Sequence, residues 1–459
     1  MAGLGGPELG LDGITPAVYL PRSLMRLIGN KARLLPSIER FLRERGITGG
    51  TLIDIFSGTA NVGRHFKKLG FRVIANDTLA AGYTQAVAGV EVSRYPDFEP
   101  LRSAFRAVFE SREFRQELSE TREIDFGGNS ASQNRRRDRS FPLREAVHYL
   151  STRVPPREGL IFRNYCPGGP HGRRYFRDDH GRRIDGILHF LREARGGGLL
   201  SPHELHLLLA ALIDAADRVA NISGTYGAFL KTWQKNTECE LRLVPPDVIE
   251  SDQRNEAHQD DANRLIRHLK GDVLYIDPPY NRRQYIANYH VLEILAEHHR
   301  IADLEAYEAA LYGKTGLRPY EDLRSHYCVR PGGRHAPGDN ALTAFTDLVL
   351  SSRAHHVVVS YNEEGILSRD EIGAVLARFA GRRSFDFKRD LREIDFPRFR
   401  SDADRPRTNG GGGRRYSVLA GRDRNRLAEL LYFASRPGHK RRSPGRSPVA
   451  EGGQEEFRT

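Results

Sequence analysis

Residues 51–77 read TLIDIFSGTANVGRHFKKLGFRVIAND, and this stretch decides the fold class. Residues 51–56 are an apolar run typical of a buried strand, and Ser57-Gly58-Thr59 makes the turn behind it. Residues 61–69 are spaced as a helix that a following glycine closes, and residues 71–75 are the next strand. Together they form a βαβ unit, so the sequence predicts an α/β protein with a parallel sheet.

A third strand is predicted far downstream in the segment Gly271–Tyr280, which reads GDVLYIDPPY. Residues 273–276 are apolar, and Pro278 and Pro279 end the strand and force an extended turn. Open α/β sheets bind their ligands at the carboxyl ends of parallel strands. We therefore expect Asp277 and the residues after it to lie in a binding site.

The Asp277-Pro278-Pro279-Tyr280 turn suits chemistry on the exocyclic amine of a nucleic-acid base. The lone pair of such an amine is delocalised into the ring, so the nitrogen is a poor nucleophile. A rigidly held Asp277 carboxylate and Pro278 carbonyl can accept hydrogen bonds from the amine and direct its lone pair at a methyl donor, with no metal required. Tyr280 can stack on a base removed from the duplex. The alternative is a strand-terminating turn with Tyr280 packed in the core.

The turn after the first strand, Phe56-Ser57-Gly58-Thr59-Ala60, is the expected site for the methionine moiety of a cofactor. Its glycine lets backbone N–H groups approach a ligand, and Asp77 at the end of the second strand is placed to accept hydrogen bonds from ribose hydroxyls. Other nucleotide-binding α/β folds share these features. A nicotinamide cofactor is disfavoured, because the Gly-x-Gly-x-x-Gly pattern is absent and hydride transfer has no use for an Asp-Pro-Pro-Tyr turn.

The composition is that of a globular protein with a basic surface. Its 459 residues include 71 Lys and Arg against 59 Asp and Glu, a formal net charge of +12 that favours nucleic acid as a partner, with an ordinary solvated surface as the alternative. Cys166, Cys239 and Cys328 lie far apart and form no Cys-x-x-Cys pair, so neither a zinc site nor a disulfide framework is indicated. Because there is no membrane-length apolar run and no signal-peptide core, we expect a cytoplasmic protein without membrane contact.

Periodicity divides the chain into a discontinuous core and an insertion. Residues 15–85 and 222–435 carry the alternating strands and helices of the predicted sheet. Residues 86–221 do not alternate in this way and are predicted to be an inserted, mainly helical domain. The Gly-rich residues 1–14 and the basic, apolar-poor residues 436–459 are expected to be flexible or disordered.

Further elements are predicted from the same patterns. They are helices at residues 34–45, 183–194, 204–220, 261–269, 288–299 and near 341–352, and a strand at 356–360. Residues 384–422 are interpreted as a β-hairpin whose return strand is Tyr416–Ala420. The arginines of segment 135–139 indicate a solvated or DNA-facing loop.

Longer blocks around these motifs resemble the Dam-like class of adenine-specific (N6) DNA methyltransferases. They are Asp277–Tyr285 (DPPYNRRQY), Asn288-Tyr289-His290, Asn221–Lys231 (NISGTYGAFLK), Arg163–Gly169 (RNYCPGG), Arg174-Tyr175-Phe176 and Ser360-Tyr361-Asn362. The resemblance implies a doubly wound, Rossmann-like methyltransferase sheet, S-adenosylmethionine as methyl donor, no metal, and methyl transfer to adenine N6 in double-stranded DNA with base flipping. It also implies that the insertion is the target-recognition domain, and it makes a cognate restriction endonuclease a candidate partner. The oligomeric state does not follow from the sequence.

The resemblance assigns roles to single residues. Lys31 takes the place of the family's cofactor-contacting lysine, and Phe56–Ala60 that of its cofactor turn. Asp77 takes the place of the ribose-binding acid and Asp277 that of the catalytic acid. Asp261 matches a further acid before the catalytic strand and is expected to contact the substrate. Simpler alternatives are a solvated lysine at position 31 and a helix-dipole acid at position 261.

Other positions follow the family's pattern less closely. Leu27 stands where some relatives carry a tryptophan, and Ala60 replaces a second glycine of the cofactor turn. Segment 396–399 follows an aromatic–basic pattern only loosely, which makes Phe399 a candidate for base stacking. The aromatic residues of segment 226–233 are as compatible with core packing as with substrate contact.

Arg282 and Arg283 are expected to contact DNA phosphates, with surface ion pairs as the alternative.

Other functions are compatible with the same fold, and they differ in the substrate or lack catalytic activity. Methyl transfer to cytosine N4 more often uses a serine in the place of Asp277, and RNA adenine fits less well with an insertion large enough to recognise a duplex. A relic that binds DNA without chemistry is disfavoured by the intact catalytic turn.

Overall fold

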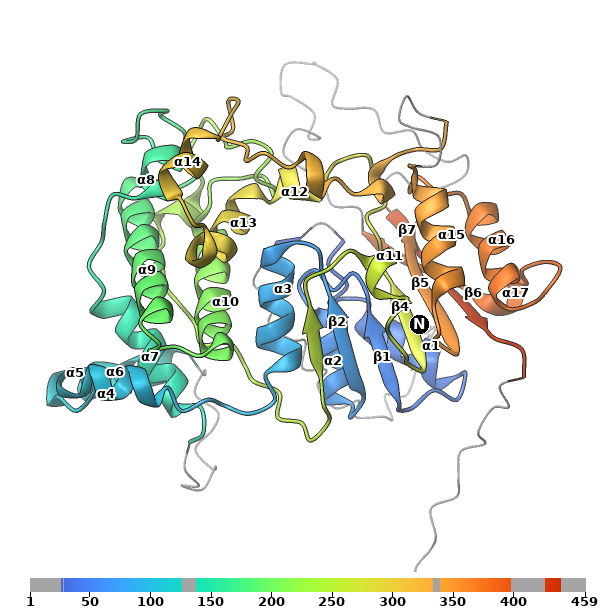
Figure 1. Cartoon of the computed structure of the whole chain (residues 1–459), viewed down its shortest axis with the longest axis horizontal. Helices are drawn as coiled ribbons and strands as arrows, with labels where there is room; N and C mark the ends of the chain where they lie inside the picture. Colours follow the sequence, from blue (N-terminus) through green and yellow to red (C-terminus); the bar gives the residue numbers. More distant parts are fainter. Residues whose placement is uncertain (1–25, 28, 126–137, 333–338, 398–425, 439–459) are drawn as a thin grey trace, which may run out of the picture.

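The computed structural model describes residues 26–27, 29–125, 138–332, 339–397 and 426–438. Within these residues, seven strands form one sheet in the order β3-β2-β1-β4-β5-β7-β6 (Figure 1). The strands are β1 (Thr51–Asp54), β2 (Arg72–Asn76), β3 (Glu256–His258), β4 (Val273–Ile276), β5 (His356–Asn362), β6 (Leu391–Pro397) and β7 (Arg426–Ser435).

The sheet is mixed, and the predicted parallel pairing and βαβ unit are confirmed for β1 to β5. β1 pairs in parallel with both β2 and β4, β3 pairs in parallel with β2, and β5 with β4. β7 is antiparallel to both of its neighbours and lies between β5 and β6. Because β1, β2 and β4 are parallel and adjacent, the residues that follow them, including Asp77 and Asp277, meet at one edge of the sheet.

Alternating side chains bury both faces of the sheet, as expected for a doubly wound fold. Along β4, Val273 and Tyr275 contact one helical layer, whereas Leu274 and Ile276 contact the other. The first layer contains α1 (Leu35–Arg43) and α2 (Asn61–Lys68). The second contains α11 (Ala262–Leu265), α15 (Ala341–Ser351) and α16 (Arg369–Phe379), and the short α17 (Phe387–Asp390) precedes β6.

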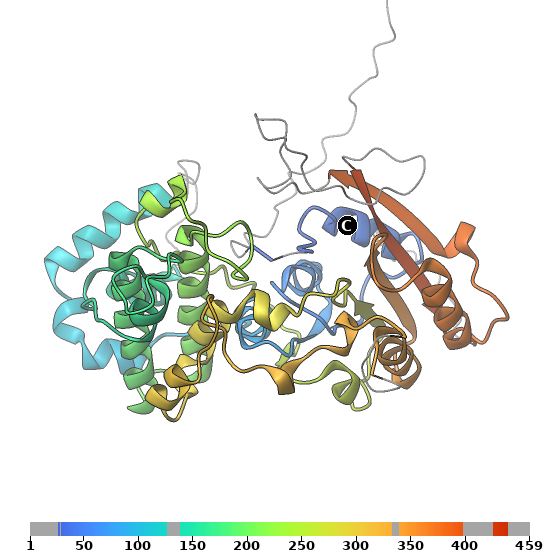
Figure 2. The same cartoon turned by 90° about the horizontal axis from the view of Figure 1, so that it is seen from above.

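A body of helices lies at the opposite end of the molecule from the β6–β7 hairpin (Figure 2). It is made of α4 (Glu99–Ala104), α5 (Arg106–Phe109), α6 (Arg112–Asp125), α7 (Phe141–Thr152), α8 (Leu160–Tyr165), α9 (Asp178–Gly196), α10 (Pro202–Val219) and α14 (Leu304–Ala309). Its apolar side chains form one cluster with those of α3 (Ala80–Ala86), which follows β2, and α13 (His290–Glu297), which follows the Asp277–Tyr280 turn. The helical body therefore shares its core with the helices that follow β2 and the Asp277–Tyr280 turn.

Several predicted elements have different bounds in the structure. The helix predicted at 261–269 is only the single turn α11. The helix predicted at 288–299 is interrupted at Tyr289, which separates α12 (Tyr285–Asn288) from α13, because Tyr289 has a non-helical backbone conformation and a buried ring. The predicted return strand Tyr416–Ala420 lies outside the described residues, and the strand that pairs with β6 is β7.

Two glycines of α9 lie in different surroundings and make a matched pair. A Cβ on Gly186 would lie 2.2 Å from the carbonyl oxygen of Pro155, whereas one on Gly196 would have nothing within 4 Å. We expect Gly186→Ala to lower the free energy of unfolding by about 1–3 kcal/mol through overpacking. Gly196→Ala should leave it unchanged or raise it by up to about 1 kcal/mol. Urea unfolding followed by circular dichroism measures both, and equal effects would contradict this packing.

Candidate active site

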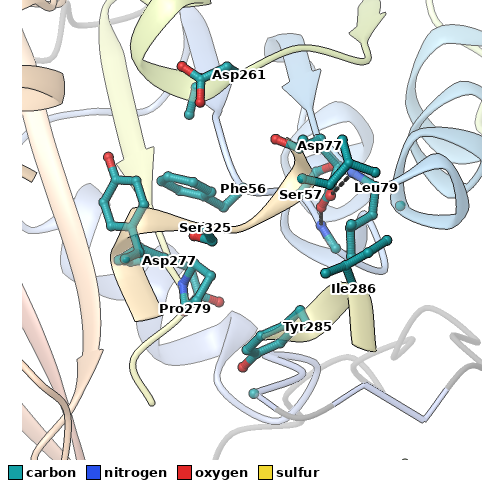
Figure 3. A pocket seen from close by; sticks show the side chains of 18 of the residues that line it. Phe56, Ser57, Asp77, Leu79, Asp261, Asp277, Pro279, Tyr285, Ile286 and Ser325 are labelled. Atoms are coloured by element: carbon teal, nitrogen blue, oxygen red, sulfur yellow. Dashed lines mark hydrogen bonds between the residues drawn. The ribbon is translucent and has the colours of Figure 1, made fainter. Parts of the chain in front are cut away.

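The carboxyl ends of β1, β2 and β4 open into a cavity of about 800 Å³. Its walls come from the turn after β1, the end of β2, the turn after β4 and the segment before α1, with Tyr285 and Ile286 of α12 lying across from them (Figure 3). The structure brings together here the residues predicted to be catalytic or to bind a cofactor, which are Lys31, Phe56, Ser57, Gly58, Asp77, Asp277, Pro278, Pro279 and Tyr280.

The turn after β1 uses backbone conformations that favour glycine. Gly58 (φ +51°) and Ala60 (φ +57°) both lie in the left-handed region. A Cβ on Gly58 would lie 2.7 Å from the end of the flexible Leu27 side chain, so a larger residue there would also have to displace that side chain. Ala60 is fully buried in a conformation that costs an alanine about 1–2 kcal/mol. The replacement of a second glycine by Ala60 is therefore a point of backbone strain in the turn.

Asp77 holds this turn in place from the end of β2. Its Oδ2 accepts a hydrogen bond from the Gly58 N–H at 2.7 Å, and its Oδ1 accepts one from the Leu79 N–H at 2.9 Å. Burial raises the pKa of Asp77 to about 6, although both N–H donors act to lower it. A Cβ on Gly82 of α3 would lie only 2.5 Å from the Asp77 Cγ. The carboxylate is thus fixed at the cavity wall from two sides.

A buried ammonium group connects the turn after β4 to the rest of the site. Lys31 Nζ lies 3.0 Å from Asp277 Oδ1 and 2.8 Å from Glu429 Oε1, and the Lys31 side chain is only 4% exposed. Burial alone would lower the pKa of Lys31, but the two carboxylates outweigh it and raise this pKa well above its ordinary value. Lys31 is therefore a buried cation and not a solvated lysine.

Two further acids of the cavity, Asp277 and Asp54, have pKa values raised to near neutral pH. Burial raises the pKa of Asp277 to about 7, with Lys31 opposing the shift and the charge of Glu429 adding to it. Burial raises the pKa of Asp54, at the end of β1, to about 8, and the charge of Asp277 adds to this shift. Asp54 Oδ2 accepts a hydrogen bond from the Gly63 N–H of α2 at 3.1 Å. The cavity therefore carries carboxyl groups that would gain from a cationic ligand.

Tyr280 lies at the cavity wall, where it is partly buried and also packs against the core that contains Leu274 and Ile276. A Cβ on Gly29 would lie 3.4 Å from the Tyr280 ring, which shows how closely the segment before α1 passes it. Asn30 ties this segment to the start of α2, since its Oδ1 accepts hydrogen bonds from the Ala32 N–H at 2.9 Å and from Asn61 Nδ2 at 2.8 Å.

Other predicted residues lie at the margin of the cavity or away from it. Asp261 caps the N-terminus of α11 and also lines the cavity, so it combines the helix-dipole position with access to a ligand. Arg282 and Arg283 are exposed directly after the catalytic turn. Tyr226 is fully buried in the core of the helical body, and Phe399 lies outside the described residues.

Ser57 Oγ is buried and has no hydrogen-bond partner among the described residues, although it lines the cavity. This orphaned polar atom is a candidate contact for a bound ligand. In the part of the chain that the structure describes, no group of His, Cys, Asp and Glu side chains is arranged to hold a metal ion. None of its helices is both long enough and apolar enough to cross a membrane.

Sequence reasoning missed Asp54 and Glu429 as parts of this site. Glu429 is 2% exposed, and its Oε1 accepts a hydrogen bond from Ser360 Oγ on β5. A signal for it exists, because Glu429 is the one charged residue in the apolar run 427–434, LAELLYFA. Asp54 gives the same signal, because it is an acid within the apolar strand TLIDIF. A buried acid needs hydrogen-bond partners, and these cannot be identified from the neighbouring sequence.

The strand order and the cavity at the carboxyl edge are those of a methyltransferase fold. Residues 27–361 match the model of the D12 class N6 adenine-specific DNA methyltransferase family, and the chain belongs to this family. The family that the sequence motifs predicted is therefore confirmed.

Three curated proteins illustrate the similarity. The chain is 35% identical to the type II methyltransferase M.FokI of Planomicrobium okeanokoites, over 77% of this chain and 46% of that protein. It is 30% identical to the type II methyltransferase M.NlaIII of Neisseria lactamica, over 82% of this chain and 93% of that protein. It is 30% identical to the modification methylase StsI of Streptococcus sanguinis, over 82% of this chain and 49% of that protein. The chain thus spans about half the length of M.FokI and StsI, and no solved structure matches it.

The raised pKa of Asp54 makes stability depend on pH in a defined direction. In the unfolded chain an aspartate has a pKa near 4, whereas in the folded protein that of Asp54 is about 8. The unfolded state therefore gains by ionising between these values, and burial of Asp54 costs progressively more stability as the pH rises. Asp54→Asn removes this cost and should be stabilising relative to the natural chain, by an amount that grows from about pH 4 to about pH 8 to a few kcal/mol.

Thermal unfolding of both proteins at several pH values measures this difference. Asp252→Asn, at a side chain that is 93% exposed and pairs with Arg94, is the control and should show no such trend. A difference between Asp54→Asn and the natural chain that does not vary with pH would contradict a buried, neutral Asp54.

Proposed function

We propose that this chain is a site-specific DNA methyltransferase that transfers a methyl group from S-adenosylmethionine to N6 of adenine in duplex DNA. The observation that carries the proposal is the meeting of the Asp277–Tyr280 turn, the β1 turn and Asp77 around one cavity. Membership of the D12 class family supports the same reaction. Since the chain covers only part of two of the relatives, we extend their activity to it as a proposal.

The residues of the cavity fit S-adenosylmethionine, which supplies an electrophilic methyl group on a positively charged sulfur. Asp77 would hold the ribose hydroxyls, and the backbone of Phe56–Gly58 would hold the methionine moiety together with Ser57 Oγ, which has no partner among the described residues. Lys31 is expected to contact the cofactor at the same wall of the cavity. The carboxyl groups of Asp54, Asp77 and Asp277, whose pKa values burial raises, favour a ligand of positive charge.

Asp277 and Pro278 prepare the amine of the target base. The Asp277 carboxylate and the Pro278 carbonyl accept hydrogen bonds from the amine hydrogens, which draws the nitrogen toward tetrahedral geometry and exposes its lone pair. The prolines make this turn rigid, so that the acceptors are in place before the base arrives. Tyr280, at the cavity wall beside them, stacks on the flipped adenine.

DNA recognition uses surfaces around the cavity. Arg282 and Arg283 are exposed next to the catalytic turn and are placed to contact phosphates, and the net charge of +12 supports binding to a polyanion. We propose the helical residues 86–221 as the target-recognition domain, Asp261 at the cavity margin as a substrate contact, and Phe399 as a further stacking residue. The relatives named as type II methyltransferases support a cognate restriction endonuclease as partner, and we expect both to act in the cytoplasm.

The proposed function is tested by mapping modified bases. Expression in a host that lacks its own DNA methylation, followed by single-molecule sequencing, should show N6-methyladenine in one recurring sequence. Asp277→Ala should lower the rate of methylation by about a hundredfold or more, with DNA binding and the fold retained. Asp252→Ala, at an exposed surface pair with Arg94, is the matched control and should methylate normally. Absence of modified adenine in any sequence would reject the assignment.

The methylation rate should also rise as the pH passes through about 7. Burial raises the pKa of Asp277 to about 7, and below that value the protonated carboxyl group loses part of its capacity to accept hydrogen bonds from the amine. The measurement is kcat/KM for a DNA duplex from about pH 6 to about pH 9, with circular dichroism to verify folding at each pH. A profile that is flat through neutrality would show that ionised Asp277 is not required.

A further inference from the structure

The β6–β7 hairpin carries a buried acid on an otherwise apolar face. On β7, Glu429 shares its face with Leu431 and Phe433, which pack into the same core as α1. Glu429 is 2% exposed, and β7 is an interior strand of the sheet, so its carboxylate cannot turn to water at an edge. Burial of an ionised carboxylate is costly unless the group is paired and hydrogen-bonded.

The partners of Glu429 lead directly to the catalytic turn. Its Oε1 accepts a hydrogen bond from Ser360 Oγ and lies 2.8 Å from Lys31 Nζ, which in turn lies 3.0 Å from Asp277 Oδ1. A continuous line of polar contacts therefore runs from β5 through β7 and the segment before α1 to the end of β4. The register of the sheet fixes this line, because Glu429 pairs with Asn362 of β5.

The family match does not extend to this residue. It ends at residue 361, and the whole β6–β7 hairpin follows that point. A role for Glu429 thus has to be argued from its own contacts.

We propose that Glu429 is a positioning residue that shares the Lys31 ammonium with Asp277 and so keeps Asp277 a strong hydrogen-bond acceptor for the adenine amine. The inference rests on the proposed function. Its physical basis is competition for one cation: with carboxylates at 2.8 and 3.0 Å, the ammonium neutralises neither completely. Without charge at position 429, Lys31 would pair with Asp277 alone, and a fully paired carboxylate accepts a further hydrogen bond less strongly.

The charges that face Lys31 set the direction of each expected change. They are those of Asp277 from the turn after β4 and of Glu429 from β7, and the charge of Asp277 acts in turn on Asp54 of β1. The Tyr275 phenol of β4 also lies near Lys31, but burial raises its pKa well above the ordinary value, so it carries no charge near neutral pH. The charge of Glu429 raises the pKa of both Lys31 and Asp277, so its removal should lower both. Lys31 lowers the pKa of Asp277, so removal of Lys31 should raise it.

Glu429→Gln removes the charge and keeps the size of the side chain. We expect it to lower kcat/KM for methylation by about tenfold, with KM for DNA unchanged, and to move the acidic limb of the pH profile to lower pH. Lys31→Met should move that limb to higher pH. The double variant should be no slower than Lys31→Met, because Glu429 acts through Lys31.

The control is Glu393→Gln on β6, which removes a charge from the same hairpin. Glu393 pairs with Arg369 at the surface with 39% of its side chain exposed, and its replacement should change neither the rate nor the pH profile. Glu429→Asp keeps the charge but shortens its reach, and should show the shifts of Glu429→Gln in smaller measure. It serves as the test where circular dichroism shows that Glu429→Gln does not fold.

A readout without DNA or cofactor separates this proposal from the proposed function. Carbon-13 NMR of carboxyl-labelled aspartate in the full chain, with Asp277→Asn to assign the signal, should show Asp277 titrating at lower pH in Glu429→Gln and at higher pH in Lys31→Met. If the natural chain modifies no adenine, the proposed function fails while this titration still tests the network. An unchanged Asp277 titration in Glu429→Gln, or rate losses that add to those of Lys31→Met, would reduce Glu429 to a structural residue and overturn the proposal.

Discussion

The chemistry of this molecule depends on holding charge where water hardly reaches. Parallel packing of β1, β2 and β4 forces the residues at their ends into one cavity, and these include Asp54, Asp77 and Asp277. Burial raises the pKa values of all three carboxyl groups, so their ionised forms need a nearby positive charge. The Lys31 ammonium supplies part of it within the chain, and a cationic ligand would supply more.

The edge of the sheet where β1, β2 and β4 end was predictable because its sequence signals are local. An apolar run that ends in Asp277-Pro278-Pro279 contains both the strand and the reason for its end, and β4 is found at the residues expected. The same holds for the βαβ unit, whose strand, turn and helix follow one another without interruption. The βαβ pattern predicts that Gly58 and Asp77 serve one cofactor site, and the structure adds a hydrogen bond between them that the pattern does not predict.

What could not be predicted depends on contacts between distant parts of the chain. β7 lies between β5 and β6 in the sheet. This strand order depends on pairing between distant segments and cannot be read from the sequence. Lys31 was singled out by resemblance, but its burial between two carboxylates requires that β4, β7 and the segment before α1 be brought together. The single core of the helical body and α13 was hidden for the same reason, since an apolar helix face does not name its partner.

The position of β7 in the sheet has a consequence for folding during synthesis. Synthesis begins at the N-terminus, so β4 and β5 are made before β7. Until β7 is made, β5 lacks its antiparallel neighbour in the sheet. Only when β7 docks beside β5 does Glu429 reach Lys31 and complete the charge arrangement. Chains released before this point would carry the whole Asp277–Tyr280 motif but would lack the contact between Glu429 and Lys31.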